Sequence, residues 1–268
     1  LLKSPITTPL GTGFRSLNVM LRKKYDLYAN MRPARSNSAV KTPFENVDIV
    51  MFRENTEDLY AGVETQVDQD TAHSIKIITR KCSERIIRAA FGYAQKNGRK
   101  KVTCVHKANI MKISDGLFRD IFYEVSKEYP QVQAEDKIVD NVAMQLVMQP
   151  QKFDVIVTEN LYGDILSDLT SGLIGGLGLL PSSNMGEDFA MFEAVHGSAP
   201  DIAGKGIANP TAFLWSACMM LEHLGKQETA VKIRRAVDEV LRQGTALTPD
   251  LGGTAGTKEY TEEIIRQL

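Results

Sequence analysis

Cysteine is scarce in this chain, and the three cysteines present lie far apart. Cys82, Cys104 and Cys218 form no CxxC pair, which argues against a zinc site and against a disulfide framework. Each lies in a helix-like or strand-like segment, so we expect buried free thiols. Free thiols indicate a reducing compartment, a condition that the bacterial cytoplasm and the mitochondrial matrix both meet.

The chain also lacks an excess of charge of one sign, a long apolar run and a dinucleotide fingerprint. Its 32 Lys and Arg against 33 Asp and Glu give a formal net charge of -1. This balance, together with the absence of a membrane-length apolar run or a signal peptide, predicts no nucleic-acid partner and no membrane partner. The sequence contains no GxGxxG, which argues against a Rossmann dinucleotide site.

Strand-like and helix-like segments alternate along the 268 residues. Such alternation is typical of an α/β protein with a largely parallel sheet. Residues 66–78 are polar and then β-prone, as in a projecting hairpin or an arm between subunits. The predicted strands are 47–52, 101–105 and 154–157, and the predicted helices are 82–96, 115–128, 141–148, 211–223 and 228–242.

The segment 153–168 carries two carboxylates where a strand-like run gives way to a helical pattern. Asp164 and Asp168 are four residues apart, so both lie on one face of the expected helix. The ends of strands in α/β sheets are also where such folds bind ligands. From these residues alone two interpretations stay open. Asp164 caps the helix and Asp168 is solvated, or the pair binds a divalent metal.

Three arginines lie near predicted strand or loop boundaries: Arg22, Arg32 and Arg53. Arginine is suited to bidentate recognition of carboxylates. The three together indicate a ligand with several carboxylates, although any one of them alone would be better explained as a surface ion pair.

Several motifs of the chain occur in the order found in a known family. They are SLNVMLR, LYANMRP, FRENTEDLYAG, HKANIMK, VDNVAMQLV, NLYGDILSD, HGSAPDIAGKGIANP and DLGG. This set resembles the β-decarboxylating dehydrogenases, which include isocitrate, homoisocitrate, 3-isopropylmalate and tartrate dehydrogenases. The resemblance covers essentially the whole chain. The family's N-terminal GDGIGPE segment is not in the sequence, so we expect a member that is truncated at its N-terminus.

The resemblance implies the α/β two-domain fold of the isopropylmalate and isocitrate dehydrogenases, which is not a Rossmann fold. A discontinuous cofactor-binding domain would comprise residues 1–27 and 175–268. Residues 28–174 would form the domain for substrate, metal and dimerisation, with a clasp or arm around 58–79.

The resemblance also implies a metal site and two catalytic residues. Asp164 and Asp168 would bind Mg2+ or Mn2+, with Asp140 as a third carboxylate from across a dimer interface. Alone, Asp140 could equally be the N-cap of the following helix. Tyr60 and Lys107 match the family's catalytic tyrosine and lysine, and the lysine acts in the partner subunit's site. The active site would therefore be shared within a homodimer or a higher oligomer.

The segment from His196 to Asn209 matches the family's adenosine-binding loop. Asp201 would accept hydrogen bonds from the ribose hydroxyls of NAD and would repel the 2'-phosphate of NADP, so NAD is the expected cofactor. Relatives that use NADP have lysine and tyrosine where Asp201 and Ile202 stand. The implied cofactor-binding residues are Asn109, Glu193, His196, Gly197, Ser198, Ala199, Pro200, Asp201, Ile202, Asn209 and Asp250.

For the substrate, the resemblance implies a malate core whose carboxylates the three arginines would clamp. Ser16 and Asn18 are small polar residues at the place where isocitrate enzymes carry serine and asparagine, whereas isopropylmalate would need an apolar pocket. The expected activity is the NAD-dependent oxidative decarboxylation of isocitrate, a tricarboxylate, to 2-oxoglutarate and CO2. The alternatives are homoisocitrate or 3-isopropylmalate dehydrogenase, an inactive fragment, and a non-catalytic regulatory subunit.

Overall fold

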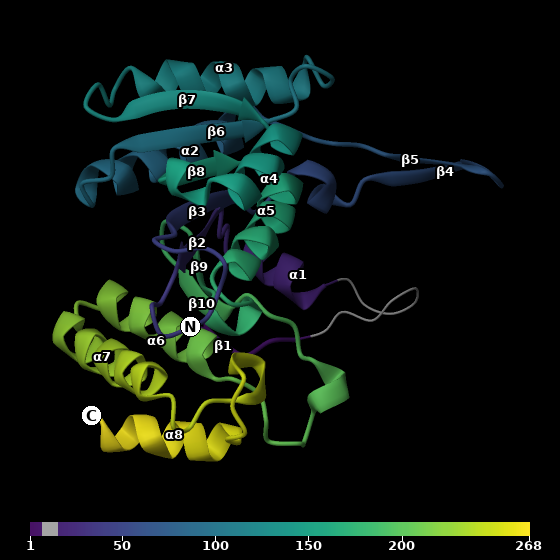
Figure 1. The fold of residues 1–268 in the computed structure, drawn as a ribbon. Helices are drawn as coiled ribbons and strands as arrows, with labels where there is room; N and C mark the ends of the chain where they lie inside the picture. Colours follow the sequence, from purple (N-terminus) through teal and green to yellow (C-terminus); the bar gives the residue numbers. More distant parts are fainter. Residues whose placement is uncertain (7–15) are drawn as a thin grey trace.

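The computed structural model describes residues 1–6 and 16–268, in which eight strands form one sheet in the order β1-β10-β9-β2-β3-β8-β6-β7 (Figure 1). Helices flank this sheet, which confirms the predicted α/β class. The strands are β1 Leu2–Lys3, β2 Ala29–Arg35, β3 Asp48–Glu54, β6 Lys101–His106, β7 Gln133–Ile138, β8 Val155–Thr158, β9 Pro181–Met185 and β10 Ala190–Ala194.

The sheet is mixed. Its four parallel pairs are β1 with β10, β3 with β8, β8 with β6, and β6 with β7. The central strand β2 pairs antiparallel with both β3 and β9, and β9 pairs antiparallel with β10. The prediction of a largely parallel sheet is therefore right for one half and incomplete for the other. The difference arises because β2 and β9 contain many polar residues, whereas a buried strand is normally recognised from a run of apolar residues.

The helices are α1 Leu17–Lys24, α2 Arg80–Lys96, α3 Ser114–Ser126, α4 Val139–Met148, α5 Asn160–Leu173, α6 Thr211–His223, α7 Gln227–Gln243 and α8 Thr257–Arg266. Short 3-10 helices are η1 Asp58–Ala61, η2 Pro150–Lys152, η3 Leu177–Leu179, η4 Pro200–Ile202 and η5 Pro249–Leu251. All five predicted helices are present, with ends that differ by no more than two residues.

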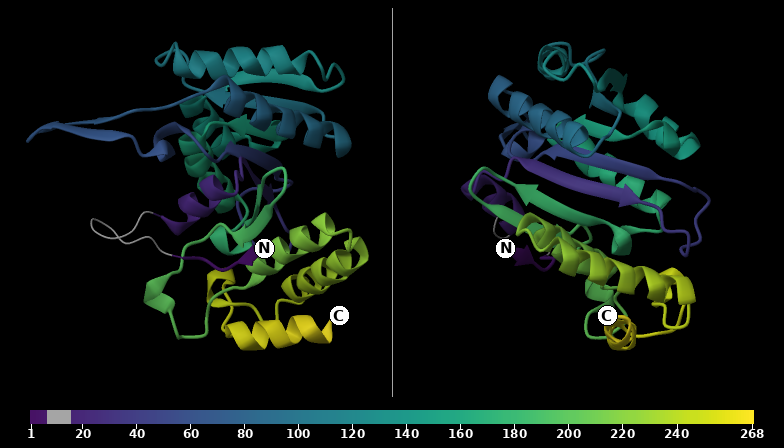
Figure 2. Two further views of the ribbon diagram at one scale, coloured as in Figure 1. Left: turned by 180° about the vertical axis from the view of Figure 1, so that it is seen from behind. Right: turned by 90° about the vertical axis from the view of Figure 1, so that its left-hand side faces the viewer.

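Two hydrophobic clusters hold helices against the sheet. One cluster joins α2 and α3 to β3, β6 and β8 through residues such as Ile86, Phe91 and Phe122. The other joins α4 and α5 to the sheet through residues such as Leu146 and Leu166. Helices α2 and α5 therefore cover opposite faces, as Figure 2 shows from behind and from the side. Burial of apolar side chains on both faces explains the consecutive apolar residues in the middle of β3 and at the start of β8.

Helix α2 illustrates why the sequence folds as it does. Its apolar residues recur at helical spacing, and Ile86, Ile87, Ala90 and Phe91 are fully buried. The hydroxyl of Thr79 accepts a hydrogen bond from the backbone N–H of Cys82 at 3.3 Å and so caps the first turn.

Strands β4 Glu64–Asp68 and β5 Thr71–Ser74 form an antiparallel hairpin that projects from the body of the chain (Figure 1). Every residue of both strands is exposed. The predicted projecting hairpin is therefore present, and its use as an arm between subunits stays a prediction.

The predicted domain boundary falls inside the sheet. Strands β1, β10 and β9 belong to the predicted cofactor domain, and β2 begins the predicted substrate domain. Residues 7–15 of the predicted segment 1–27 lie outside the described residues. Among the described helices, none combines the length and apolarity needed to cross a membrane.

Candidate active site

Asp164 on α5 is contacted by side chains from three other elements, β3, η1 and β2. Arg53 on β3 donates to Oδ1 of Asp164 through Nη1, and its Nε donates to Asn160 at 2.9 Å. Tyr60 on η1 donates to Oδ2 of Asp164 at 2.5 Å. The guanidinium carbon of Arg53 also lies 4.9 Å from the centroid of the Tyr60 ring. Three of the predicted site residues thus lie together.

The glycine before Asp164 makes room for Arg53. A Cβ placed on Gly163 would lie 2.5 Å from Cγ of Arg53, which is too close for two non-bonded carbon atoms. Arg53 is only 1% exposed and has little space into which it could move. The glycine of the motif NLYGD is therefore required by the approach of β3 to α5.

Arg32 on β2 reaches the same helix. Its Nη1 lies 3.4 Å from Oδ1 of Asp164 and 3.8 Å from Oδ1 of Asp168, and it donates to the hydroxyl of Ser167. Burial lowers the pKa of Arg32, and the charge of Arg53 lowers it further. This crowding of guanidinium groups disfavours their charge, and an anionic ligand would relieve it.

The two carboxylates of α5 have different electrostatic surroundings. Burial acts to raise the pKa of Asp164, but the charges of Arg53 and Arg32 outweigh burial and hold that pKa below its ordinary value. Burial raises the pKa of Asp168, and the charge of Asp164 adds to this rise while Arg32 opposes it. The side chain of Asp168 is 58% exposed, so this carboxylate is accessible to a ligand.

Helix α5 begins at Asn160, with Glu159 as its N-cap. Asp164 therefore lies in the second turn and cannot cap the helix, so the capping interpretation is wrong. Asp168 is largely exposed but lies within ion-pair distance of Arg32, so it is not merely solvated.

The chemistry of the carboxylate pair fits a hard divalent cation. Both residues offer oxygen atoms, the ligands that Mg2+ and Mn2+ prefer. Burial and then the charge of Asp164 raise the pKa of Asp168, and a cation would relieve this repulsion between the carboxylates. Within residues 1–6 and 16–268, no three His, Cys, Asp or Glu side chains come together as a metal site. One chain therefore offers two of the three predicted carboxylates, and metal binding stays a prediction.

Lys107 and Asp140 form a second, separate group. Nζ of Lys107 donates to Oδ1 of Asp140, and this hydrogen bond lowers the pKa of Asp140. Asp140 lies in the first turn of α4, whose N-cap is Ile138, so the alternative that Asp140 caps this helix is wrong. The structure thus pairs the two residues predicted to act in a partner's site.

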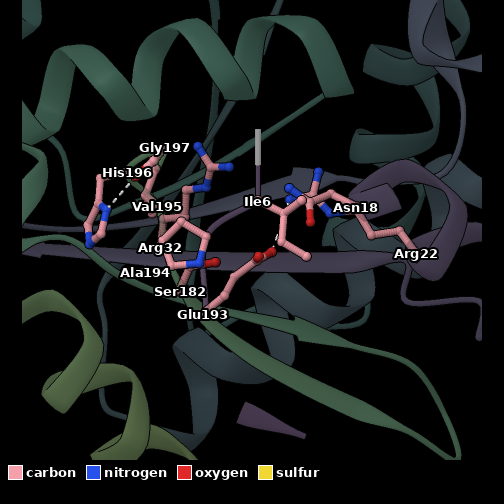
Figure 3. A pocket seen from close by; sticks show the side chains of 11 residues that line it. Ile6, Asn18, Arg22, Arg32, Ser182, Glu193, Ala194, Val195, His196 and Gly197 are labelled. Carbon is pink, nitrogen blue, oxygen red and sulfur yellow. Dashed lines mark hydrogen bonds and ion pairs between the residues drawn. The ribbon is translucent and has the colours of Figure 1, made fainter. Parts of the chain in front are cut away.

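A pocket lies between the predicted substrate and cofactor residues (Figure 3). Arg22, which is four residues after Asn18 on α1, shares its helix face. Both side chains hold a buried atom without a hydrogen-bond partner among the described residues, Oδ1 of Asn18 and Nε of Arg22, as does Nη2 of Arg53. The pocket is lined by Pro5, Ile6, Asn18, Arg22, Arg32, Ser182, Glu193, Ala194, Val195, His196 and Gly197.

Ser16 takes the N-cap position of α1, although its side chain makes no capping hydrogen bond. Glu193 on β10 lies at the floor of the pocket, where Oε2 is 2.7 Å from Nζ of Lys3 and Oε1 accepts from Arg22 at 3.2 Å. The charges of Arg22 and Lys3 outweigh burial and lower the pKa of Glu193.

The other predicted cofactor residues lie mainly on the segment after β10. Gly197, Ser198, Ala199, Pro200 and Asp201 are exposed, and Ile202 is half-buried. Asn209 donates to Asp250 on η5 at 2.9 Å, which joins two of the predicted residues. Asn109 is exposed beyond Lys107 and does not line the pocket.

Sequence reasoning missed several residues that shape the site. Asn30 accepts a hydrogen bond from Arg32, Ser167 accepts another, and Asn184 contacts Glu193. The available signal was an asparagine within a strand, as at Asn30 in β2 and Asn184 in β9.

Comparison with known proteins agrees with these observations. Residues 1–264 match the family model described as isocitrate/isopropylmalate dehydrogenase. A protein of Dictyostelium discoideum, named as a regulatory subunit of mitochondrial isocitrate dehydrogenase [NAD], is 56% identical over 100% of this chain and 76% of its own length. A 3-isopropylmalate dehydrogenase of Methanothermobacter thermautotrophicus is 55% identical over 93% of this chain and 75% of its own length.

The fold agrees as well. The crystal structure of isocitrate dehydrogenase from Methylococcus capsulatus superposes with a TM-score of 0.96 at 56% identity, covering 99% of this chain and 80% of that one. The family predicted from the sequence motifs is therefore confirmed, and the chain belongs to the isocitrate/isopropylmalate dehydrogenase family.

Proposed function

We propose that this chain is an NAD-dependent isocitrate dehydrogenase that converts isocitrate to 2-oxoglutarate and CO2. The observation that carries the proposal is the pocket in which Asn18, Arg22 and Arg32 converge, where the buried donor Nε of Arg22 has no hydrogen-bond partner among the described residues. Unsatisfied buried polar groups are costly, and carboxylates are the ligands that guanidinium groups satisfy best.

The arginines bind and orient the substrate in this proposal. Arg32 and Arg53 are held by Asp164 and by a second hydrogen bond each, to Asn30 and Asn160 respectively. Guanidinium groups fixed in this way lose little entropy when a carboxylate binds, and they hold it in one orientation. Asn18 offers a polar partner for the carboxylate that distinguishes isocitrate from isopropylmalate.

Asp164, Asp168 and the partner subunit's Asp140 would hold the divalent cation. When bound, Mg2+ or Mn2+ polarises the C2 oxygen and stabilises the negative charge that develops there. Asp164 is ionised because Arg53 and Arg32 lower its pKa, so it is ready to act as a ligand at neutral pH.

Two side chains would move protons. Lys107 accepts the proton of the C2 hydroxyl as the C2 hydride leaves for NAD, which is the electron acceptor. The bond from C3 to its carboxylate then breaks to release CO2, and Tyr60 protonates C3 of the resulting enol. Burial raises the pKa of Tyr60, so the phenol keeps its proton until C3 takes it.

The cofactor would lie along the segment from Glu193 to Asn209, beside the substrate pocket. Exposed Asp201 would accept hydrogen bonds from the adenosine ribose and repel a 2'-phosphate. Glu193, His196 and Gly197 line the pocket together with Arg22 and so adjoin the substrate.

The active unit in this proposal is a dimer. Supporting it are exposed apolar residues on α4 and α5, namely Met144, Val147, Met148 and Ile165, which are 50%, 51%, 66% and 57% exposed. Met144, Val147 and Met148 recur at helical spacing along one face of α4, and a contiguous exposed apolar face is typical of a protein interface. The apolar Val67 of the projecting hairpin is also exposed.

A second candidate is a non-catalytic subunit of a hetero-oligomer, which the name of the Dictyostelium relative favours. All eight predicted clamp, catalytic and metal residues are present here, which favours the catalytic role. They are Arg22, Arg32, Arg53, Tyr60, Lys107, Asp140, Asp164 and Asp168.

A substrate panel tests the proposal. Purified protein with Mg2+ is assayed with isocitrate, homoisocitrate, 3-isopropylmalate and tartrate, each with NAD and with NADP. We expect the highest kcat/KM with isocitrate and NAD. A preference for 3-isopropylmalate or for NADP would contradict the specific activity within the family, and no turnover with any pair would favour the regulatory role.

A further inference from the structure

A line of hydrogen bonds runs beneath the pocket from Arg32 to Glu193. Nε of Arg32 donates to Oδ1 of Asn30 at 2.7 Å, and Nδ2 of Asn30 donates to Oδ1 of Asn184 at 2.8 Å. Nδ2 of Asn184 donates to Oε1 of Glu193 at 2.9 Å. Glu193 in turn accepts from Arg22 at 3.2 Å. Two of the predicted substrate arginines are thus joined by two buried asparagines.

The direction of these bonds is fixed at both ends. A guanidinium group can only donate and a carboxylate can only accept. Asn184 must therefore turn its NH2 toward Glu193, which leaves its oxygen toward Asn30. Asn30 must then turn its own NH2 toward Asn184 and its oxygen toward Arg32. Only one orientation of each amide satisfies the whole line.

The line crosses the sheet between β2 and β9. Asn30 and Asn184 are directly opposite each other in the antiparallel register, and both are fully buried. Asn30 also donates to Ser182 at 3.1 Å, and Asn55 donates to Asn184 at 3.0 Å. Buried polar networks in which each amide has its partners are rigid and allow few alternative arrangements.

Figure 3 shows that Arg22, Arg32 and Glu193 surround one pocket although they come from α1, β2 and β10. If they were not linked, arginines on separate elements would each lose conformational entropy when a carboxylate binds. The line of hydrogen bonds fixes the orientation of both guanidinium groups before the ligand binds.

We propose that Asn30 and Asn184 are positioning residues that hold Arg32 and Arg22 in one fixed arrangement for binding a substrate with several carboxylates. This inference rests on the proposed function, because it takes the two arginines as the substrate clamp. It adds two residues that touch no substrate and act only through their neighbours. Their loss would weaken substrate binding more than the chemical step.

Calorimetric titration with isocitrate and Mg2+ tests the inference, since no turnover occurs without NAD. Leucine has the same branched side-chain skeleton as asparagine, although its methyl groups are larger, and it makes no hydrogen bonds. We expect Asn30→Leu and Asn184→Leu each to raise the Kd for isocitrate about tenfold, with a smaller change in kcat. The double variant would be no worse than either single, because one break already disconnects the line.

Ser183→Ala is the matched control. Ser183 is buried on β9 between Ser182 and Asn184, the two residues that bond to Asn30. Its hydroxyl has no hydrogen-bond partner among the described residues. Its Kd for isocitrate should stay near that of the unmodified protein. Thermal melting checks that each variant folds, and Asn30→Ser and Asn184→Ser replace any leucine variant that does not.

The outcomes separate the two proposals. Unchanged Kd values in both single variants would overturn the positioning role, as would strictly additive losses in the double variant, which a purely structural role predicts. If the unmodified protein binds 3-isopropylmalate and not isocitrate, the proposed function fails, and the same variants are titrated with 3-isopropylmalate, whose malate core carries the same carboxylates. An unmodified protein that binds neither acid would overturn both.

Discussion

The hydroxyl of Tyr60 lies 2.5 Å from Oδ2 of Asp164, so the proposed proton donor and a proposed metal ligand share a hydrogen bond. Burial raises the pKa of Tyr60, and the hydrogen bond to Asp164 adds to the rise while Arg53 opposes it. Asp164 is itself kept ionised by Arg53. The acid is therefore protonated and oriented by a group that is never protonated at neutral pH.

Replacing Tyr60 by phenylalanine should abolish most of the turnover while leaving substrate binding nearly intact. A positioned general acid contributes about 100-fold or more to rate, so kcat should fall by at least that factor. Steady-state kinetics with isocitrate and NAD would measure it. Tyr25→Phe is the control, since Tyr25 is exposed and stacks on Phe189. An unchanged kcat in Tyr60→Phe would remove Tyr60 from the mechanism.

Adding one methyl group at position 163 should destabilise the protein by displacing the buried side chain of Arg53. In Gly163→Ala the new Cβ would meet Arg53, and overpacking of this kind costs about 1–3 kcal/mol. Gly172→Ala in the same helix is the control, because its Cβ would meet nothing within 4 Å and alanine favours helix by up to about 1 kcal/mol. Urea unfolding should move the two midpoints in opposite directions. Equal shifts of the two urea midpoints would show that Arg53 can move away from the new methyl group at little cost in free energy.

Asp168→Asn should stabilise the metal-free protein slightly and remove its response to Mg2+. The folded pKa of Asp168 is raised, so the folded state holds the proton more tightly than the unfolded state does. Ionisation therefore costs stability, and this cost grows as the pH rises from about 3.8 through the folded pKa, so it is present at neutral pH. The amide removes it, although exposure keeps the effect small.

Thermal melting with and without Mg2+ would reveal the difference. The unmodified protein should gain stability with Mg2+ by mass action, whereas Asp168→Asn should gain little. If both proteins respond equally to Mg2+, the cation binds elsewhere.

A mixture of two inactive variants should recover activity if the site is shared. In Lys107→Met and Tyr60→Phe homodimers every site lacks one group. A mixed dimer has one site with an intact Tyr60 and its partner's intact Lys107. After unfolding and refolding of an equal mixture, random pairing gives about one quarter of the unmodified activity. Activity no greater than that of the separate variants would place both residues in the same subunit's site.

The sequence predicted the helices well because their cores are apolar at regular spacing. The predicted helix 211–223 matches α6 to the residue, and the carboxylates of α5 share a face as their spacing required. Strand β2 was not predicted, because its sequence ANMRPAR is rich in polar residues and contains a proline, which argues against a central strand.

What the spacing could not predict is which elements meet. Arg53 reaches Asp164 only because β3 passes beside α5, and Asn30 meets Asn184 only through an antiparallel register that no local pattern specifies. The arginines were therefore found as single residues from motifs, and the contacts that fix them were found only in the structure.

Within residues 1–6 and 16–268, helix α1 is held by fewer buried side chains than the strands that carry the other arginines. Of its eight residues only Arg22 is buried, whereas Arg32 and Arg53 are anchored in the sheet. Changes at Ser16 or Asn18 would consequently disturb few neighbours. Under the proposed function Ser16 and Asn18 set the substrate preference, so redesign for another 2-hydroxy acid should begin on this short segment and leave Arg32 and Arg53 unaltered.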